Sequence, residues 1–202
     1  MSGPRVSVGL PVYNGERYLA ETIESLLNQT HKDFEIVISD NASTDRTKEI
    51  CQKYMAMDGR IRYHRNPENL GAHANYNQAF LRARGVYFKW ASSNDLCGPR
   101  FLEACVRALD EHPEVVLAHP RTRLLMGDSG ATEEYQERVH VDQDQACERF
   151  CDFLEHCYFN NVMNGVIRAE NLRHTGLMGR YGGADIVLMA ELALYGKFVQ
   201  VP

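Results

Sequence analysis

Short runs of β-branched and aromatic residues alternate with segments of helical periodicity along the first half of the chain. This alternation constrains the fold strongly, because strands that are joined by helices run parallel within one sheet. We expect strands at residues 6–10, 34–38, 61–64, 86–91 and 115–119, and helices at 19–28, 72–84, 99–112 and from caps at 43–45 to about 57. The pattern predicts an α/β fold, with a doubly wound, mostly parallel, Rossmann-like sheet and helices on both faces of a single domain.

The second half of the chain follows a less regular pattern. We expect strands at 122–126, 162–168 and from 198, and helices at 146–157 and 185–195. Residues 128–148 hold seven acids and one base, which predicts a solvated loop, with a lid or an acceptor-binding loop as the alternative. The last strand starts just before Pro202, so we expect that a C-terminal region is missing.

Composition and charge exclude several classes of function. The 202 residues are 44% apolar and 24% charged, which is typical of a globular domain, and the net charge of −5 argues against a nucleic-acid partner. No apolar run is long enough for a transmembrane segment, and the N-terminus lacks a signal sequence, so we expect a cytoplasmic protein. The glycine-rich dinucleotide loop, the Walker A loop and the serine hydrolase elbow are also absent from the sequence.

Polar residues follow the first four expected strands. Parallel strands end at the same edge of a sheet, and ligands of such sheets bind beyond that edge. Tyr13 is suited to stack on a flat base, whereas Asn14 and the glycine after it allow backbone amides to turn inward. Asp40 is suited to accept the imide proton of a base, and Asn41 to bind the neighbouring ribose or base edge. Together these residues indicate a nucleotide site.

The third and fourth loops add groups that suit a diphosphate. Asn69 and Gly71 precede a helix whose amino end favours an anion. Asp95 offers a carboxylate for a divalent cation that would neutralise a diphosphate, and Asn94 offers an amide for ribose or water. The alternative for this loop is a stretch that is polar because it faces solvent.

Several spaced motifs resemble family 2 glycosyltransferases. They are VGLPVYNG at 8–15, LLNQT at 26–30, FEIVISDNASTD at 34–45, NLG at 69–71 with Asn77, the loop at 92–99, and the stretch from Ala184 and Asp185 to GKF at 196–198. The similarity covers nearly the whole chain. It implies a GT-A fold, a nucleotide-sugar donor that is most often UDP-linked, and a Mg²⁺ or Mn²⁺ ion.

The resemblance also implies roles for individual residues. It places donor contacts at Pro11, Tyr13, Asn14, Asp40, Asn41, Asn69, Gly71 and Asn94, the metal ligand at Asp95, and the catalytic base at Asp185. Residues 1–120 would form the donor half and 121–202 the acceptor half of one domain. The implied reaction is inverting, metal-assisted transfer of a sugar to a hydroxyl group of a glycan or lipid-linked acceptor, as in polysaccharide biosynthesis. A lipid-linked acceptor would bring the protein to the inner face of the membrane.

Two departures from the family pattern leave an alternative open. The metal loop usually carries three acids, whereas here Ser92 and Asn94 leave Asp95 alone, and Ala184 replaces the acid that usually precedes the base. A single carboxylate holds a cation less tightly. The alternative function is therefore a nucleotide-sugar-binding module that has lost catalysis. A nucleotidyltransferase would share the sheet, but it would need a basic, glycine-rich first loop. Asp185 also has a plain alternative role as a helix cap.

Overall fold

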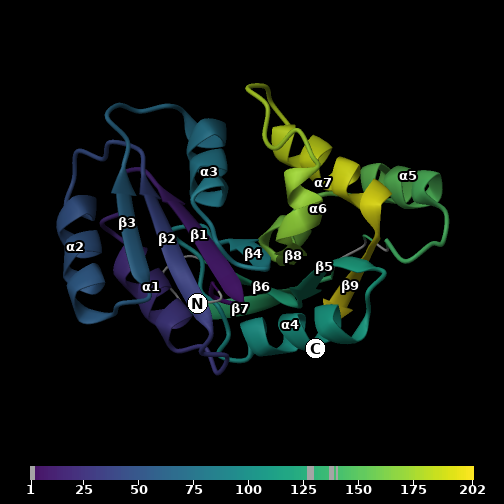
Figure 1. Ribbon diagram of the computed structural model, residues 1–202, viewed down its shortest axis with the longest axis horizontal. Helices are drawn as coiled ribbons and strands as arrows, with labels where there is room; N and C mark the ends of the chain where they lie inside the picture. Colours follow the sequence, from purple (N-terminus) through teal and green to yellow (C-terminus); the bar gives the residue numbers. More distant parts are fainter. Residues whose placement is uncertain (1–2, 127–129, 137–138, 140) are drawn as a thin grey trace.

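The computed structural model describes residues 3–126, 130–136, 139 and 141–202, which form one mixed sheet covered by helices (Figure 1). The sheet has seven strands in the order β3-β2-β1-β4-β8-β5-β9. These strands are β1 (Val6–Val12), β2 (Phe34–Asp40), β3 (Ile61–Arg65), β4 (Tyr87–Trp90), β5 (Val115–Pro120), β8 (Val166–Arg168) and β9 (Lys197–Val201). β8 runs antiparallel to β4 and β5, while the other pairs are parallel. The predicted doubly wound, mostly parallel α/β fold is confirmed.

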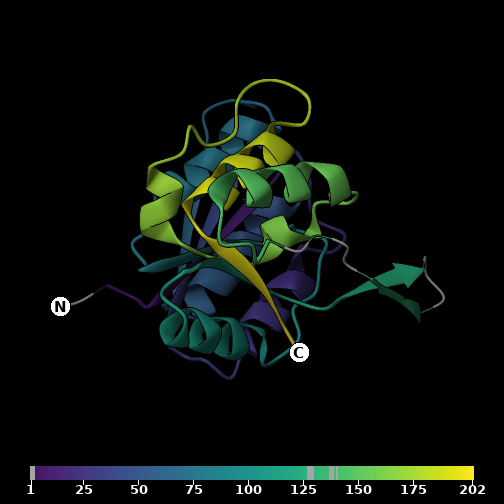
Figure 2. The same ribbon diagram turned by 90° about the vertical axis from the view of Figure 1, so that its right-hand side faces the viewer.

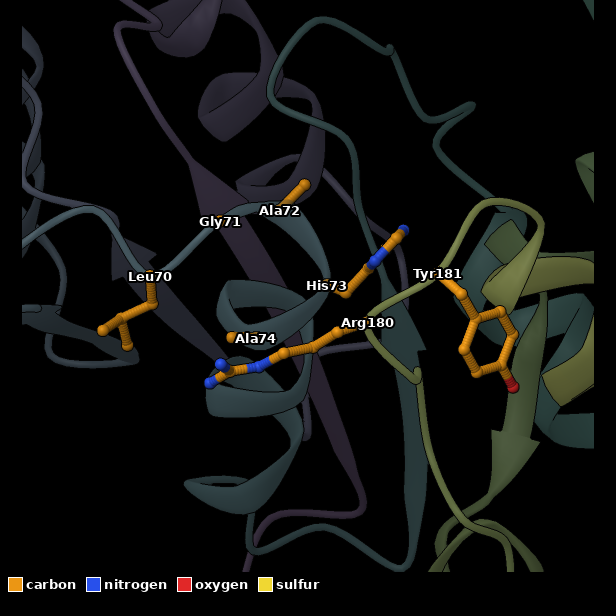
Figure 3. A pocket seen from close by; sticks show the side chains of 7 residues that line it. All are labelled: Leu70, Gly71, Ala72, His73, Ala74, Arg180 and Tyr181. Atoms are coloured by element: carbon orange, nitrogen blue, oxygen red, sulfur yellow. The ribbon is translucent and has the colours of Figure 1, made fainter.

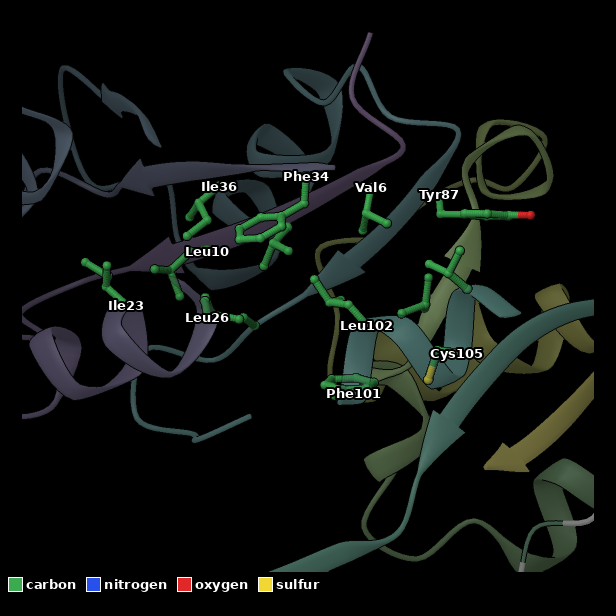
Figure 4. Close-up of a cluster of buried hydrophobic side chains, with 14 of the residues drawn as sticks. Val6, Leu10, Ile23, Leu26, Phe34, Ile36, Tyr87, Phe101, Leu102 and Cys105 are labelled. Carbon is green, nitrogen blue, oxygen red and sulfur yellow. The ribbon is translucent and has the colours of Figure 1, made fainter. Parts of the chain in front are cut away.

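Helices cover both faces of the sheet. They are α1 (Leu19–Leu27), α2 (Thr47–Met57), α3 (Ala72–Leu81), α4 (Phe101–Glu111), α5 (Ala146–His156), α6 (Ala169–Arg173) and α7 (Ala184–Tyr195), with a short 3₁₀ helix at Asn161–Asn164. α1, α2 and α4 pack on one face through a core that includes Leu26, Phe34 and Leu102 (Figure 4). On the other face, α3, α5, α6 and α7 enclose a second core around Phe88 and Trp90. Among the described residues, no helix has the length and apolarity needed to cross a bilayer.

β1 shows why the sheet forms where the sequence predicts it. Val6, Val8 and Leu10 alternate along the strand and are fully buried in the first core. Gly9 faces the other side, where an added Cβ would lie 2.5 Å from the Phe88 ring. Because that contact is far too short for a side chain, α3 and β4 approach β1 closely only with glycine at this position.

Two expectations for the second half were wrong. Part of the stretch predicted as a loop forms β7 (Ala131–Tyr135), which pairs with β6 (Thr122–Met126) in a hairpin that projects from the body (Figure 2). Most of the hairpin is exposed, so it lacks the alternation of apolar and polar residues that marks a half-buried strand. The strand expected at 162–168 is instead a 3₁₀ helix followed by the three residues of β8, and α6 was not expected. Gly165 separates the two, lying against the Ala118 carbonyl of β5.

Candidate functional site

The loops that follow β1, β2 and β4 and the segment before α3 line one pocket of about 410 Å³. Its lining is Pro11, Val12, Tyr13, Asn41, Asn69, Gly71, Ala72, Asn75, Tyr76, Ser92, Ser93 and Asn94. The predicted convergence of the four rim loops is therefore present in the structure. Six of the eight residues predicted to bind the donor line this pocket; the other two are Asn14 and Asp40.

Asn14 holds the first loop against the second. Its φ of 51° is left-handed. The Asn14 amide donates to the Ser43 hydroxyl over 2.9 Å, and its side-chain oxygen accepts the Thr44 amide over 2.8 Å. Its backbone and side chain are thus engaged within the protein, whereas the Tyr13 ring next to it is 50% exposed at the pocket. The Tyr13 ring in this loop is open to a ligand.

Asp40 is buried beneath the second loop. Its carboxylate accepts the Ser43 amide (2.9 Å), the Tyr63 hydroxyl (2.6 Å) and Arg65 Nη1 (2.7 Å). Burial by itself raises the pKa of Asp40, but hydrogen bonds from Ser43, Tyr63 and Arg65 outweigh it and lower the pKa. Asp40 therefore stays charged and orders the loop that presents Asn41. Its direct contact with a base remains a prediction.

Four asparagines join the second and third loops. Asn41 Nδ2 donates to Asn69 Oδ1 over 2.8 Å, and Asn41 Oδ1 accepts the Leu70 amide over 2.9 Å. Asn75, on α3, donates to the Ser39 carbonyl over 2.9 Å and accepts from Asn66 over 3.0 Å. Amides both donate and accept, so this network fixes the pocket wall without placing a charge in it.

The predicted caps of α2 are divided between two tasks. Asp45 accepts the Thr47 amide over 3.0 Å, although the N-cap of α2 is Arg46, which makes no side-chain cap hydrogen bond. The Ser43 hydroxyl and the Thr44 amide instead bond to Asn14. The capping segment thus also connects the first and second loops.

Tyr76 lines the pocket and is influenced by both carboxylates that were predicted to act in the reaction. Burial raises the pKa of Tyr76, and the charges of Asp95 and Asp185 raise it further, while a hydrogen bond with Ser92 lowers it. Both charges thus act on one tyrosine that lines the pocket, while neither carboxylate lines it itself. Asp95 itself is exposed, beside the lining residue Asn94.

Asp185 lies in the first turn of α7, where Gly183 is the N-cap with a left-handed φ of 76°. Its carboxylate accepts the Asn160 side-chain amide over 2.9 Å, and α7 has no side-chain cap hydrogen bond. The capping role is therefore not what holds Asp185. A Cβ added to Gly182 or Gly183 would meet nothing within 4 Å, so the space beside Asp185 is open.

A divalent cation fits this site only if the protein supplies some of its ligands and a bound molecule supplies the others. Within the ranges that the structure describes, no three His, Cys, Asp or Glu side chains group to hold a metal ion. Asp95 is a single carboxylate, and Ser92, Ser93 and Asn94 add neutral oxygens. Mg²⁺ commonly binds proteins through one or two carboxylates together with substrate phosphates. These ligand atoms suit an ion whose remaining coordination positions are filled by a diphosphate.

A second, smaller pocket of about 260 Å³ adjoins the first and shares Gly71 and Ala72 with it. Figure 3 shows Arg180 lying across the first turn of α3 toward Leu70, whereas the Tyr181 ring points away. Asn77 anchors the segment that carries Arg180, donating to the Met178 carbonyl over 2.9 Å and accepting its amide over 3.1 Å. The segment leading to Asp185 is thus fastened to α3.

Sequence reasoning missed three residues here. Asn75 and Tyr76 lie about one helical turn after Gly71, so their position on the first turns of α3 was a usable signal. Asn160 is 25 residues from Asp185, and no local pattern indicates their contact.

Comparisons with known proteins identify relatives of this chain. The family model described as glycosyl transferase family 2 matches residues 7–155. The uncharacterized glycosyltransferase MJ1057 of Methanocaldococcus jannaschii is 38% identical over 119 residues, which are 58% of this chain and 41% of that protein. The chain spans about two fifths of the length of such curated relatives.

Solved structures share the fold. The TarS structure from S. aureus in complex with UDP-GlcNAc has a TM-score of 0.77 at 20% identity, covering 98% of this chain and 56% of that one. The mannosyltransferase PcManGT from Pyrobaculum calidifontis, in complex with GDP-Man and Mn²⁺, has a TM-score of 0.71 at 18% identity, covering 100% of this chain and 56% of that one. At these identities the likeness establishes the GT-A fold.

Proposed function

The chain belongs to glycosyl transferase family 2, and from this premise we propose that it transfers a sugar from a nucleotide-diphosphate donor to a hydroxyl group of an acceptor. One observation carries the proposal: the loops after β1, β2 and β4 and the segment before α3 line a single pocket, and its lining residue Asn94 directly precedes Asp95. A donor in that pocket would lie beside the loop that carries the proposed cation ligand, Asp95.

The pocket suits the nucleoside part of a donor. Tyr13 offers a half-exposed ring for stacking on a base, and Asn41, Asn69 and Asn94 offer amides for the base edge and the ribose. The neighbouring structures in complex with UDP-GlcNAc and GDP-Man support a nucleotide sugar as the donor class. We propose UDP as the nucleotide, because donors in the family it resembles are most often UDP-linked.

Asp185 is the proposed catalytic base. It takes the proton of an acceptor hydroxyl, whose oxygen then forms a bond to the anomeric carbon as the bond from that carbon to the diphosphate oxygen breaks. Attack from the face opposite the leaving group inverts the configuration. Open space at Gly182 and Gly183 leaves room for the acceptor, which would be a glycan or a lipid-linked sugar.

Asp95, with Asn94 beside it, would hold a Mg²⁺ or Mn²⁺ ion together with the donor's phosphates. When bound, such an ion supplies positive charge that stabilises the departing diphosphate. In this scheme residues 1–120 bind the donor, and residues 121–202 supply the base and the acceptor side.

A second candidate is a donor-binding module without catalysis. The observation that favours it is the lone carboxylate of the 92–95 loop, since Ser92 and Asn94 occupy positions where the family usually has acids. Under this alternative UDP-sugar binds, but the bond to the diphosphate stays intact.

Thermal unfolding with UDP and Mn²⁺ tests donor binding. A ligand at about 100 times its Kd stabilises by about 2.7 kcal/mol, which raises Tm by roughly 5–10 °C in a domain of this size. Asp95→Ala should lose most of the Mn²⁺-dependent part, while Asp33→Ala, an exposed acid just before β2, should keep it. Equal stabilisation of all three proteins would exclude Asp95 as the ligand. Release of UDP from UDP-GlcNAc then separates a transferase from the binding module.

A further inference from the structure

Three aromatic side chains meet on the surface where the β6–β7 hairpin joins the body. The Phe159 ring lies 5.4 Å from Tyr135, at the end of β7, and 4.7 Å from Tyr158, in edge-to-face arrangements. Tyr158 is 76% exposed and Phe159 57% exposed. We call Tyr135, Tyr158 and Phe159 the aromatic platform. Such large exposed rings next to one another commonly mark a contact surface.

The platform adjoins the candidate base through one residue. Asn160 follows Phe159 directly and donates its side-chain amide to the Asp185 carboxylate over 2.9 Å. Asn160 has a left-handed φ of 50°, which is uncommon for a residue with a side chain. The turn at Asn160 thus joins the exposed rings of Tyr158 and Phe159 to the side chain that contacts Asp185.

Two polar atoms at this turn have no partner among the described residues. They are Asn160 Oδ1 and Asn161 Nδ2, and both are buried. Unpaired buried polar atoms are rare in folded proteins, because each costs free energy that a hydrogen bond would recover. Both unpaired atoms thus belong to the two residues that directly follow the aromatic platform in the chain, and one of these residues, Asn160, contacts Asp185.

We propose that the aromatic platform binds a neutral sugar ring of the acceptor and so presents its hydroxyl group to Asp185. The proposal rests on the proposed function and names the chemistry of its acceptor side. A pyranose ring has a face of C–H groups that stacks on the negative face of an aromatic ring, and a rim of hydroxyls that hydrogen-bonds to amides and carboxylates. The platform and Asn160 offer this combination side by side.

The surrounding charge favours a neutral ring over an acidic one. Glu133 and Glu134 precede Tyr135 on β7 and are exposed, and Glu134 pairs with Arg123 over 3.5 Å. An anionic sugar or a phosphate near the platform would meet like charges. A second copy of this chain is the competing occupant of the platform.

Ligand-observed saturation-transfer NMR tests the proposal with defined probes. The probes are methyl β-D-glucopyranoside, methyl α-D-mannopyranoside, methyl N-acetyl-β-D-glucosaminide, and UDP as an internal control. At least one glycoside should receive saturation from the wild-type protein, most strongly at its ring C–H protons. Phe159→Ala should weaken that binding by roughly tenfold, as expected for loss of an aromatic stacking partner, whereas Phe159→Tyr should retain it. Tyr18→Ala, which removes an exposed aromatic ring before α1, should change nothing.

The UDP signal separates this proposal from the proposed function. UDP binding that persists in Phe159→Ala, together with loss of the glycoside signal, supports the platform and shows that the variant is folded. Glycoside binding that is absent from the wild type, or unchanged in Phe159→Ala, overturns the platform while leaving donor binding intact. A wild-type protein that binds glycoside but not UDP overturns the assignment to an acceptor. Sedimentation showing a dimer that Phe159→Ala dissociates, with glycoside signals unchanged, also overturns the platform.

Discussion

Replacing Asp40 by asparagine should destabilise the protein, because Asp40 is the charged centre of the loop that follows β2. The Asp40 side chain is fully buried and accepts the Ser43 amide, the Tyr63 hydroxyl and Arg65 Nη1. Asparagine keeps the shape but loses the charge and turns an NH₂ group toward these donors. Breaking a buried ion pair costs about 3–5 kcal/mol. The Arg65 side chain is 35% exposed, so water replaces part of its interaction. We expect a loss of about 2–3 kcal/mol, or roughly 5–10 °C in Tm.

The pH dependence of that loss gives a second check. The folded-state pKa of Asp40 lies below its ordinary value, because the hydrogen bonds from Ser43, Tyr63 and Arg65 outweigh the effect of burial. Its contribution is therefore complete above the unfolded pKa of about 4 and disappears as the pH falls through the folded pKa. The difference in unfolding free energy between the wild type and Asp40→Asn should be constant from about pH 8 to about pH 5 and shrink below about pH 4. Urea unfolding at each pH measures it, with Asp33→Asn as the exposed control.

Two results would refute this reasoning. One is an Asp40→Asn protein that unfolds within about 1 °C of the wild type. The other is a difference that persists undiminished in acid. UDP binding to the variants Asp40→Asn and Arg65→Met then distinguishes a loop-ordering role of Asp40 from a direct contact with the base. Weaker UDP binding in both variants means that Asp40 acts through the loop. Weaker UDP binding in Asp40→Asn alone means that Asp40 contacts the base.

Three further changes test the site and the fold. Asp185→Asn should keep UDP binding and lose UDP release from UDP-GlcNAc, since the amide cannot take the acceptor proton; retained turnover would exclude Asp185 as the base. Burial lowers the pKa of His119 to about 4, so the unfolded state binds the proton first as the pH falls below about 6.5, and stability falls with it. Between about pH 7.5 and about pH 4.5, the unfolding free energy should therefore fall by about 2.5 kcal/mol less in His119→Gln than in the wild type. Equal falls in denaturant titrations of the two proteins would contradict this. Gly9→Ala should cost about 1–3 kcal/mol in urea unfolding through overpacking against Phe88, and an unchanged midpoint would show that the sheet adapts.

The first half of the fold was predictable because its buried strands and amphipathic helices leave a strong periodic pattern. β1 and β2 are buried along their whole lengths, and α1 and α4 turn apolar stripes toward the same core. β7 was not predicted because it is exposed on both faces, and β8 was not predicted because it has only three residues. Neither offers a period long enough to detect. β7 pairs with its neighbour β6, whereas β8 depends on pairing with β4 and β5, which are distant in sequence.

The position of the site could be predicted from the sequence, but the contacts between its residues could not. The rule that ligands bind beyond the carboxyl ends of parallel strands located Tyr13, Asn41 and Asn94 at one pocket. The same rule does not say which polar group faces the ligand and which one holds the loops. Asn14 and Asp40 are engaged in loop contacts, and that division follows from hydrogen bonds between segments about 25–30 residues apart. Asn160 was not found, since its relation to Asp185 exists only in the folded chain.

The lining of the pocket bears on the loss of acids from the 92–95 loop, which departs from the family pattern. Of the described residues that line it, none carries a formal charge. Amides, hydroxyls and the Tyr13 ring suit a neutral nucleoside, but they offer no positive charge to a diphosphate. Under the proposed function, compensation for the phosphates comes from outside this lining, from a cation held at Asp95 and from Arg180, which lines the adjoining pocket at the amino end of α3. Under the proposed function, the donor's phosphates help to hold the cation at Asp95, so loss of neighbouring acids weakens the free metal site more than the site with donor bound.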